Sequence, residues 1–315
     1  MQTKDSQKAD FKVETIFNYN DVHETVLEKD GKFEEAMFTN PRGLCFDCFG
    51  NLIVCCQLPG KIRKVDFKTK LVSTIFSTQN PEQQNCISLT ISNNNTIYFV
   101  DFISKAVKRL SPRGEISVIY PATEAQRQQQ QLENQNRGDT IYNPIRLELD
   151  GSEKFLYIVD LNNHTIKKLE IENCENVQLL CGKPGQPGFI DGIGEDARLY
   201  FPFCIAKNKS EDFLLISDYN NQAIRKFELK TRMLRTVYGG NRSKSAITFD
   251  QVNIYSPKGI IMDADDNLYV CNGDLNYKNG GSIEKISFRD QRTTTLYKGA
   301  NVLEKLGNEK RNPLF

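Results

Sequence analysis

The sequence predicts an all-β fold, a β-propeller of four-stranded blades, and three observations support this prediction. A β-rich run of six residues occurs five times and ends at positions 56, 101, 160, 218 and 272. Successive ends are 45, 59, 58 and 54 residues apart, which is a spacing typical of one propeller blade. Prolines at the starts of units and turn-forming residues between strands recur at corresponding positions. We therefore expect a ring of five or six blades.

Each unit can be divided into four short strands. Proline begins the first strand of four units, at Pro41, Pro144, Pro202 and Pro257, where it removes no hydrogen bond from the ladder. The six-residue run is the second strand, and the third strand carries an apolar anchor followed by basic residues. The fourth is an apolar run such as 71–76 or 234–238. A meander of this kind buries both faces only against neighbouring blades, so the units should form a ring.

Charged residues recur at two places in the unit. The third strands contain the pairs Arg63-Lys64, Lys108-Arg109, Lys167-Lys168 and Arg225-Lys226, with Glu284-Lys285 in the fifth unit. We interpret these pairs as a solvated blade edge, with a surface for an acidic partner as the alternative. Three second strands end in Asp101, Asp160 and Asp218. We expect these carboxylates to accept hydrogen bonds from backbone amides of the following turn rather than to bind a cation.

The repeat unit resembles that of the NHL repeat family. The match is best at Tyr157-Ile-Val-Asp-Leu-Asn-Asn-His-Thr-Ile-Lys-Lys168 and at 215–226, and the Gly-rich segment 182–202 between them looks like the long inter-blade connection of many NHL propellers. The resemblance covers roughly residues 40 to 299 and departs at Cys56, where the family usually has aspartate. It implies a propeller whose loop faces bind other proteins, although a fold of this kind hosts many functions.

The predicted boundaries follow the repeat. Residues 1–10 are expected to form a flexible N-terminus, 11–299 the propeller and 300–315 a C-terminal tail, with a low-complexity, flexible insertion at 124–140. Val13-Glu-Thr-Ile-Phe17 matches the fourth-strand pattern and could close the ring as an outer strand. Arg311-Asn-Pro-Leu-Phe315 resembles the start of another unit. Two options stay open: five full blades with decorating ends, or a sixth blade that is incomplete here and is finished by a partner.

Composition narrows the class of protein. Lys and Arg number 41 against 40 for Asp and Glu, and this balance does not favour a nucleic-acid partner. The first ten residues lack the apolar run of a secretory signal, and no run of about 18 apolar residues predicts a membrane span. The nine cysteines are an odd number and suit a reducing compartment. We expect an intracellular protein, with the cytoplasm as first choice and no membrane insertion; the oligomeric state stays open.

The sequence predicts no catalytic residue, cofactor or metal site. Four cysteines form the motif Cys45-x-x-Cys48 followed by Cys55-Cys56. Strand alternation sends adjacent side chains to opposite faces, so we expect buried core residues rather than zinc ligands. His23 and His164 are too few for histidine-based chemistry, and His164 is expected in a surface turn. The segment 182–194 lacks the Gly-Lys-Ser/Thr ending of a phosphate loop.

The expected function is a non-catalytic protein-binding scaffold, or a subunit of a larger assembly, that uses propeller faces and inter-blade loops. Phe189, Arg198 and Tyr200 are the protein-contact candidates, because aromatic and arginine side chains anchor interfaces well. The alternative is a six-bladed metal-dependent hydrolase or lactonase-like enzyme with a divalent ion in the central channel. The inner strands disfavour the enzyme because their starts are apolar, for example at Leu44 and Ile205.

Overall fold

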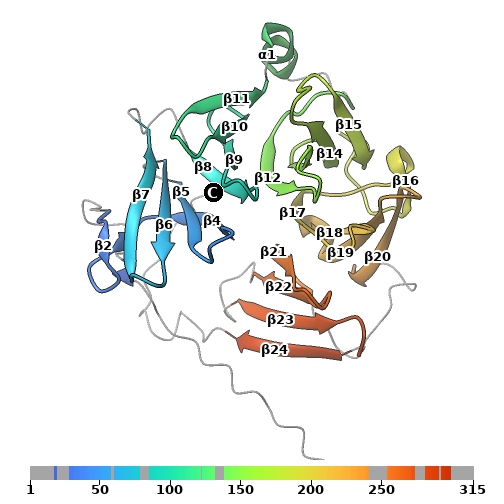
Figure 1. The fold of residues 1–315 in the computed structure, drawn as a ribbon. Helices are drawn as coiled ribbons and strands as arrows, with labels where there is room; N and C mark the ends of the chain where they lie inside the picture. The colour runs from blue at the N-terminus through green and yellow to red at the C-terminus, as the bar shows by residue number, and fades with distance from the viewer. Residues whose placement is uncertain are drawn as a thin grey trace, which may run out of the picture.

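Five sheets form the blades of a propeller in the part of the chain that the structure describes (Figure 1). The structure is a computed structural model, and it describes residues 18–19, 28–57, 60–78, 85–121, 123–131, 138–240, 254–273, 281–290 and 292–298. In each blade four consecutive strands form an antiparallel meander from the central axis outward. The predicted all-β propeller of four-stranded blades is confirmed.

The strands of the five blades follow the predicted units closely. Blade one contains β4 (Pro41–Phe46), β5 (Leu52–Cys56), β6 (Lys61–Asp66) and β7 (Leu71–Ser77). Blade two contains β8 (Cys86–Ile91), β9 (Ile97–Asp101), β10 (Ala106–Leu110) and β11 (Ile116–Tyr120). Blade three contains β12 (Pro144–Leu149), β13 (Phe155–Asp160), β14 (Thr165–Glu170) and β15 (Val177–Cys181). Blade four contains β17 (Pro202–Lys207), β18 (Phe213–Asp218), β19 (Ala223–Glu228) and β20 (Met233–Gly239). Blade five contains β21 (Pro257–Met262), β22 (Leu268–Asn272), β23 (Ser282–Ser287) and β24 (Arg292–Lys298).

Short additional strands lie outside the repeat pattern. β2 (Gly31–Lys32) pairs with β7, and β16 (Gly192–Ile193) pairs with β20, so blades one and four each gain a fifth, outermost strand. β1 (Asn18–Tyr19) pairs in parallel with β3 (Met37–Phe38). A two-residue strand carries too little alternation to be recognised from sequence.

A helix, α1 (Glu124–Gln131), lies where the sequence suggested only a flexible polar insertion. The side chain of Thr123 accepts a hydrogen bond from the backbone N–H of Gln126 at 3.2 Å, and the Gln126 side chain accepts one from the Thr123 backbone N–H at 3.2 Å. This reciprocal cap satisfies donors at the helix start, and glutamine, arginine and glutamate are good helix formers. The sequence predicted no helix here, and whether the insertion is flexible stays a prediction.

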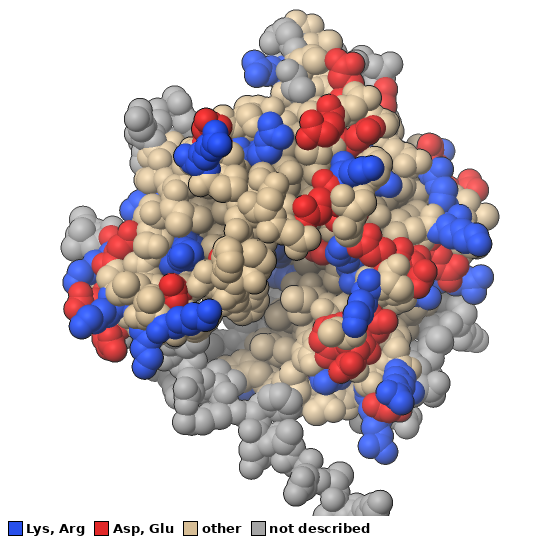
Figure 2. Space-filling view, viewed as in Figure 1, with Lys and Arg blue, Asp and Glu red and all other residues tan. Residues whose placement is uncertain are grey.

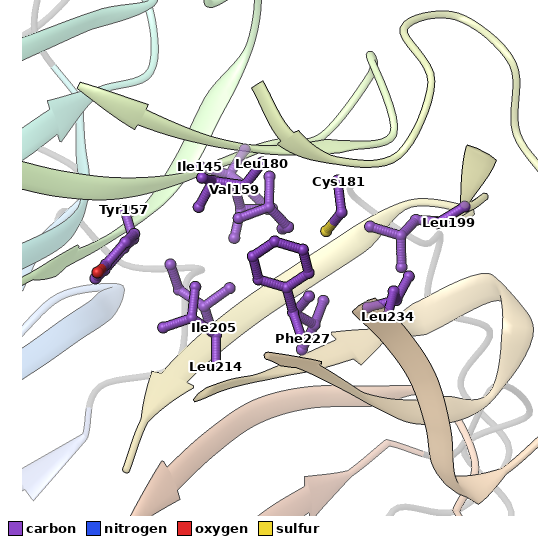
Figure 3. Close-up of a cluster of buried hydrophobic side chains, with 13 residues drawn as sticks. Ile145, Tyr157, Val159, Leu180, Cys181, Leu199, Ile205, Leu214, Phe227 and Leu234 are labelled. Carbon is purple, nitrogen blue, oxygen red and sulfur yellow. The ribbon is translucent and has the colours of Figure 1, made fainter. Parts of the chain in front are cut away.

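The hydrophobic core lies between blades rather than within any one blade. Figure 3 shows the cluster between blades three and four, in which Val159 and Cys181 of one blade pack with Ile205, Phe227 and Leu234 of the next. Similar clusters join blade one to two, two to three, and four to five. Each blade thus depends on its neighbours for burial, as expected for a radial repeat.

The innermost strands pack in chain order around the axis. β4 contacts β8, β8 contacts β12, β12 contacts β17, and β17 contacts β21. Within the described residues, no comparable contact joins β21 of blade five to β4 of blade one. In Figure 1 these two blades face each other across the widest sector of the ring.

Several predictions fall on residues that the structure does not describe. The flexible N-terminus at 1–10, the closing strand at 13–17 and the tail at 300–315 all lie outside the described residues. In the described residues every blade takes its four radial strands from one consecutive stretch of chain.

Candidate functional site

A buried acid–base pair recurs in three blades. The aspartate that ends the second strand contacts a basic residue seven positions later on the third strand: Asp101 with Lys108 at 2.7 Å, Asp160 with Lys167 at 2.9 Å, and Asp218 with Arg225 at 2.6 Å. In blades three and four both side chains of the pair are fully buried. A charge buried this deeply is tolerated only when it is paired and hydrogen-bonded.

The backbone amides that these aspartates bind lie before the inner strand of the blade, not in the following turn as predicted. Asp101 accepts from the Asn85 amide at 3.0 Å, Asp160 from the Asn143 amide at 2.6 Å, and Asp218 from the Tyr200 amide at 2.7 Å. The following turn contributes side chains that donate hydrogen bonds to the same carboxylates. These are Ser104, Asn163 and Asn221, at 2.6, 2.8 and 2.8 Å. Each aspartate therefore ties the chain entering its blade to the turn between the middle strands.

The expectation of a solvated edge is wrong for the first residue of the basic pairs. Arg63, Lys167 and Arg225 are fully buried, because Lys167 and Arg225 each reach a buried carboxylate in the sheet and Arg63 reaches Asp30 on the connection before β2. The second residue of the pair is only half-buried, and in blades three and four its ammonium group lies over an aromatic ring, Lys168 over Phe155 at 3.7 Å and Lys226 over Phe213 at 4.4 Å. On the face shown in Figure 2, basic and acidic side chains are interspersed.

The pair in blade four supports a pocket. The Arg225 guanidinium also binds Asp191 at 2.8 Å and lies 4.9 Å from the ring centroid of Phe189. Asn221 donates to the carbonyl oxygen of Gly188 at 2.8 Å. Above this scaffold is a pocket of about 470 Å³ lined by Pro187, Gly188, Phe189, Tyr200, Asn220, Asn221, Gln222 and Gly240. The lining combines two aromatic rings with side-chain amides, which suit binding through stacking and hydrogen bonds.

Two of the three predicted contact residues line this pocket. Phe189 is half-buried, and Tyr200 is exposed at its rim. Arg198 does not line it: its guanidinium Nη1 donates to the backbone carbonyls of Glu195 and Ala197, at 2.6 and 2.8 Å. Arg198 thus braces the connection that carries the other two. That all three contact a partner stays a prediction.

The sequence analysis missed the amide side of the pocket. Asn220, Asn221 and Gln222 belong to the turn between β18 and β19, and Gln222 adopts the left-handed conformation with φ of 51°. The sequence places this turn directly after Asp218, but the hydrogen bond from the Tyr200 amide to that aspartate is seen only in the structure. Only the folded chain shows that the turn and the inter-blade connection face each other.

His164 lies in the predicted turn but is buried rather than at the surface. Its Nδ1 accepts a hydrogen bond from the Phe201 backbone N–H at 3.2 Å, and its ring meets the edge of the Phe201 ring with centroids 4.7 Å apart. Burial lowers the pKa of His164, although Asp160 opposes the effect. A neutral ring suits this acceptor role, so His164 joins blade three to the connection that enters blade four.

Ionisation of two buried carboxyl groups is disfavoured near the interface of blades three and four. Burial raises the pKa of Asp218 to about 6, against the opposing effects of Arg225, Asn221 and the Tyr200 amide. Burial also raises the pKa of Glu148 to about 7, with Lys207 and Arg146 opposing it. Perturbed carboxyl groups occur in active sites and in structural networks alike. Neither side chain lines the pocket.

The cysteine motif is divided between core and surface. Cys55 and Cys56 are buried, as predicted, whereas Cys45 is half-buried and Cys48 is exposed in the turn after β4. Burial raises the pKa of Cys45 to about 12, so its thiol is a poor nucleophile at neutral pH. Across the described ranges, no group of three or more His, Cys, Asp or Glu side chains is placed to share a metal ion.

A search of the described residues finds no helix with the length and apolar character needed to cross a membrane.

One relative of this sequence carries the NHL name, although no family model matches the chain. NHL repeat-containing protein 2 of Bos taurus is 21% identical over 311 residues, which is 85% of this chain. Protein SUPPRESSOR OF QUENCHING 1, chloroplastic, of Arabidopsis thaliana is 31% identical over 103 residues, which is 33% of this chain. The chain spans 41% of the length of the first relative and 10% of the second.

Solved structures with the same fold differ in what they do. A chain of the nidogen/laminin complex superposes with a TM-score of 0.57 at 13% identity, covering 82% of this chain and 80% of that one. Virginiamycin B lyase from Staphylococcus aureus superposes with a TM-score of 0.53 at 13% identity, covering 82% of this chain and 69% of that one. At such identity the likeness shows the fold alone. The repeat unit, the five blades and the likeness to an NHL repeat-containing protein identify this chain as an NHL-type β-propeller.

Proposed function

We propose that this propeller is a non-catalytic scaffold that binds a protein partner through the pocket of Phe189 and Tyr200. The observation that carries the proposal is the chemistry of the lining, which is made of aromatic rings, amides, glycines and a proline. The lining contains no histidine, carboxylate, lysine, serine or cysteine, which are the side chains that most often act as acids, bases or nucleophiles in catalysis. Aromatic and amide side chains instead suit recognition of a peptide segment.

The rigid support of the pocket favours binding as well. Phe189 is held between Arg225 below and Gly240 beside it, where a Cβ atom would approach Phe189 Cζ to 2.4 Å. The amide of Tyr200 is fixed by the buried carboxylate of Asp218. Side chains that are already ordered lose little entropy when a partner binds, so more of the contact energy appears as affinity.

Affinity purification of the tagged full chain from its own cells tests this proposal. The variants Tyr200→Ser and Gln222→Ala should each reduce recovery of the same protein partner about tenfold, which corresponds to the loss of about 1.4 kcal/mol. Ile103→Ser is the matched control, because Ile103 occupies the corresponding turn of blade two and is exposed. The purified partner should then show the same order of affinities for the three variants.

Two results would contradict the scaffold. Equal recovery of every partner by all three variants would remove the pocket from the interaction. Turnover of an ester or lactone panel by purified protein that contains stoichiometric calcium or zinc would favour the hydrolase alternative instead.

A further inference from the structure

Within the described residues, no blade lies between the last blade of the ring and the first. We call the face of a blade toward the next blade in chain order its trailing face, and the opposite one its leading face. Four interfaces between consecutive blades each bury one trailing face against one leading face. The trailing face of blade five and the leading face of blade one have no such partner among the described residues.

The trailing face of blade five is apolar and exposed where that of blade four is covered. Tyr238 and Tyr297 occupy the same place, each opposite the isoleucine anchor of the third strand, yet Tyr238 is 2% exposed and Tyr297 44%. Ala206 and Ile261 correspond on the inner strands, and they are 5% and 64% exposed. Cys271 is also exposed on this face. The trailing face of blade five thus carries apolar residues of the kind that are buried on blade four, and their exposed fractions show that no described residue covers this face.

The leading face of blade one shows the same contrast. Leu44 pairs with Val54 as Ile205 pairs with Ile216, so the two inner-strand residues correspond. Ile205 is 2% exposed against blade three, whereas Leu44 is 60% exposed. Phe46, two residues further on the same face, is also exposed. Exposed apolar residues grouped in this way mark interaction sites.

The segment that enters blade one is built as an inter-blade connection. In it Asp30 binds Arg63 at 2.8 Å and accepts from the Thr74 amide at 2.7 Å. The connection between blades three and four repeats these contacts, with Asp191 binding Arg225 at 2.8 Å and accepting from the Thr236 amide at 3.0 Å. Arg63 needs this partner because blade one has Cys56 where blades two, three and four have aspartate.

The match extends along the whole segment. The residues after each aspartate form β2 and β16, which pair with the fourth strand of their own blade. Bridges join Lys29 to Met37 and Ile190 to Arg198, and Ala36 and Ala197 are both fully buried. In blade four this connection brings the chain from β15 of the preceding blade. Its copy before blade one indicates that the sector beside blade one is shaped for a preceding blade.

We propose that the open sector binds one further four-stranded blade of the same repeat type, contributed by a partner polypeptide. Such a blade would offer a leading face to Ile261 and Tyr297, and a trailing face to Leu44 and Phe46. About 40 residues suffice, which is the length of one blade. A second copy of this chain would bring four further blades with it, whereas the sector needs one. The proposal is independent of the pocket, which lies at blades three and four.

Site-specific crosslinking in the full chain, expressed in its own cells, tests the proposal. A photoreactive phenylalanine analogue replaces Leu44 in one variant and Ile261 in another; both positions are exposed, so folding should tolerate the change. Both variants should crosslink to one partner, within a single stretch of roughly 40 residues with the four-strand pattern. The matched control replaces Ile193, exposed on β16 at the outer edge of blade four, and should not capture that stretch.

Alkylation of Cys271 gives a second measurement on the unaltered sequence. In the complex isolated from cells, Cys271 should react at least tenfold more slowly than in the purified chain, whereas Cys48, exposed in the turn after β4, should react equally in both. Crosslinks to a second copy, to this chain itself or to two unrelated proteins would overturn the proposal. So would the absence of crosslinks together with unchanged alkylation of Cys271. Variants of the Tyr200 pocket should leave both readouts unchanged, so the two proposals can fail separately.

Discussion

Replacing Asp218 with alanine should destabilise the propeller more than any nearby exposed change. The carboxylate accepts hydrogen bonds from the Tyr200 amide at 2.7 Å, from Asn221 Nδ2 at 2.8 Å and from Arg225 Nη1 at 2.6 Å. Both side chains of the Asp218–Arg225 pair are fully buried. The substitution therefore leaves a buried guanidinium that has lost one of its two carboxylate partners.

The magnitude follows from these contacts. Removing one partner of a buried ion pair costs about 3–5 kcal/mol, and each neutral donor left without an acceptor adds about 1 kcal/mol. Asp191 still binds Arg225, and the contributions of contacting groups do not add fully. We expect a loss of about 4 kcal/mol in the free energy of unfolding. The matched control, Asp191→Ala, removes a carboxylate that is 42% exposed and should cost about 1 kcal/mol.

Urea unfolding followed by circular dichroism measures both variants. Their midpoints should move by different amounts while the slope of free energy against urea stays unchanged. If the two variants lost equal stability, the buried pair would not be what holds the connection onto blade four. A loss below about 1 kcal/mol for Asp218→Ala would refute the argument directly.

Two more predictions concern the same part of the molecule. The pKa of Glu148 is raised to about 7 from its ordinary 4.5, so between pH 4.5 and pH 7 the folded state holds a proton on Glu148 that the unfolded state has lost. The free energy of unfolding should therefore fall as the pH rises through this window. Glu148→Gln should remove about 1–3 kcal/mol of this decline, measured by unfolding at pH 5 and pH 7.5. Gly240→Ala should weaken partner binding and lower the melting temperature, since φ of Gly240 is +72° and the new Cβ would clash with the Phe189 ring. If binding and melting temperature were both unchanged, the close contact between Gly240 and Phe189 would not be required.

Much of the fold could be predicted because it is encoded locally. The alternation of apolar residues, the prolines at Pro144 and Pro202 and the recurring spacing of the second strands all act within one blade. Blade two was the weakest unit, and its inner strand β8 begins after Asn85 without a proline. The capped helix α1 was missed because its glutamine-rich sequence carries no apolar periodicity.

The candidate site was only partly accessible from sequence. Phe189 and Tyr200 could be proposed from their residue types, but the amides of Asn220–Asn221 could not be joined to them, since the two segments meet only in the folded blade. The basic pairs were misplaced for the same reason. Whether Arg225 is solvated or buried depends on the carboxylates of Asp218 and Asp191, which reach it from a neighbouring strand and from the connection.

By itself, the sequence determined the blade: its four strands, its turns and its repeat in a propeller of the NHL type. Strand alternation and turn chemistry are properties of neighbouring residues, so one chain without a structure suffices to show them. Only the tertiary structure decided which charges are buried, that the entry to blade one copies the connection before blade four, and that apolar residues on the inner strands of blades one and five are exposed. Burial depends on which surfaces of neighbouring blades pack together, and neither periodicity nor spacing carries that information.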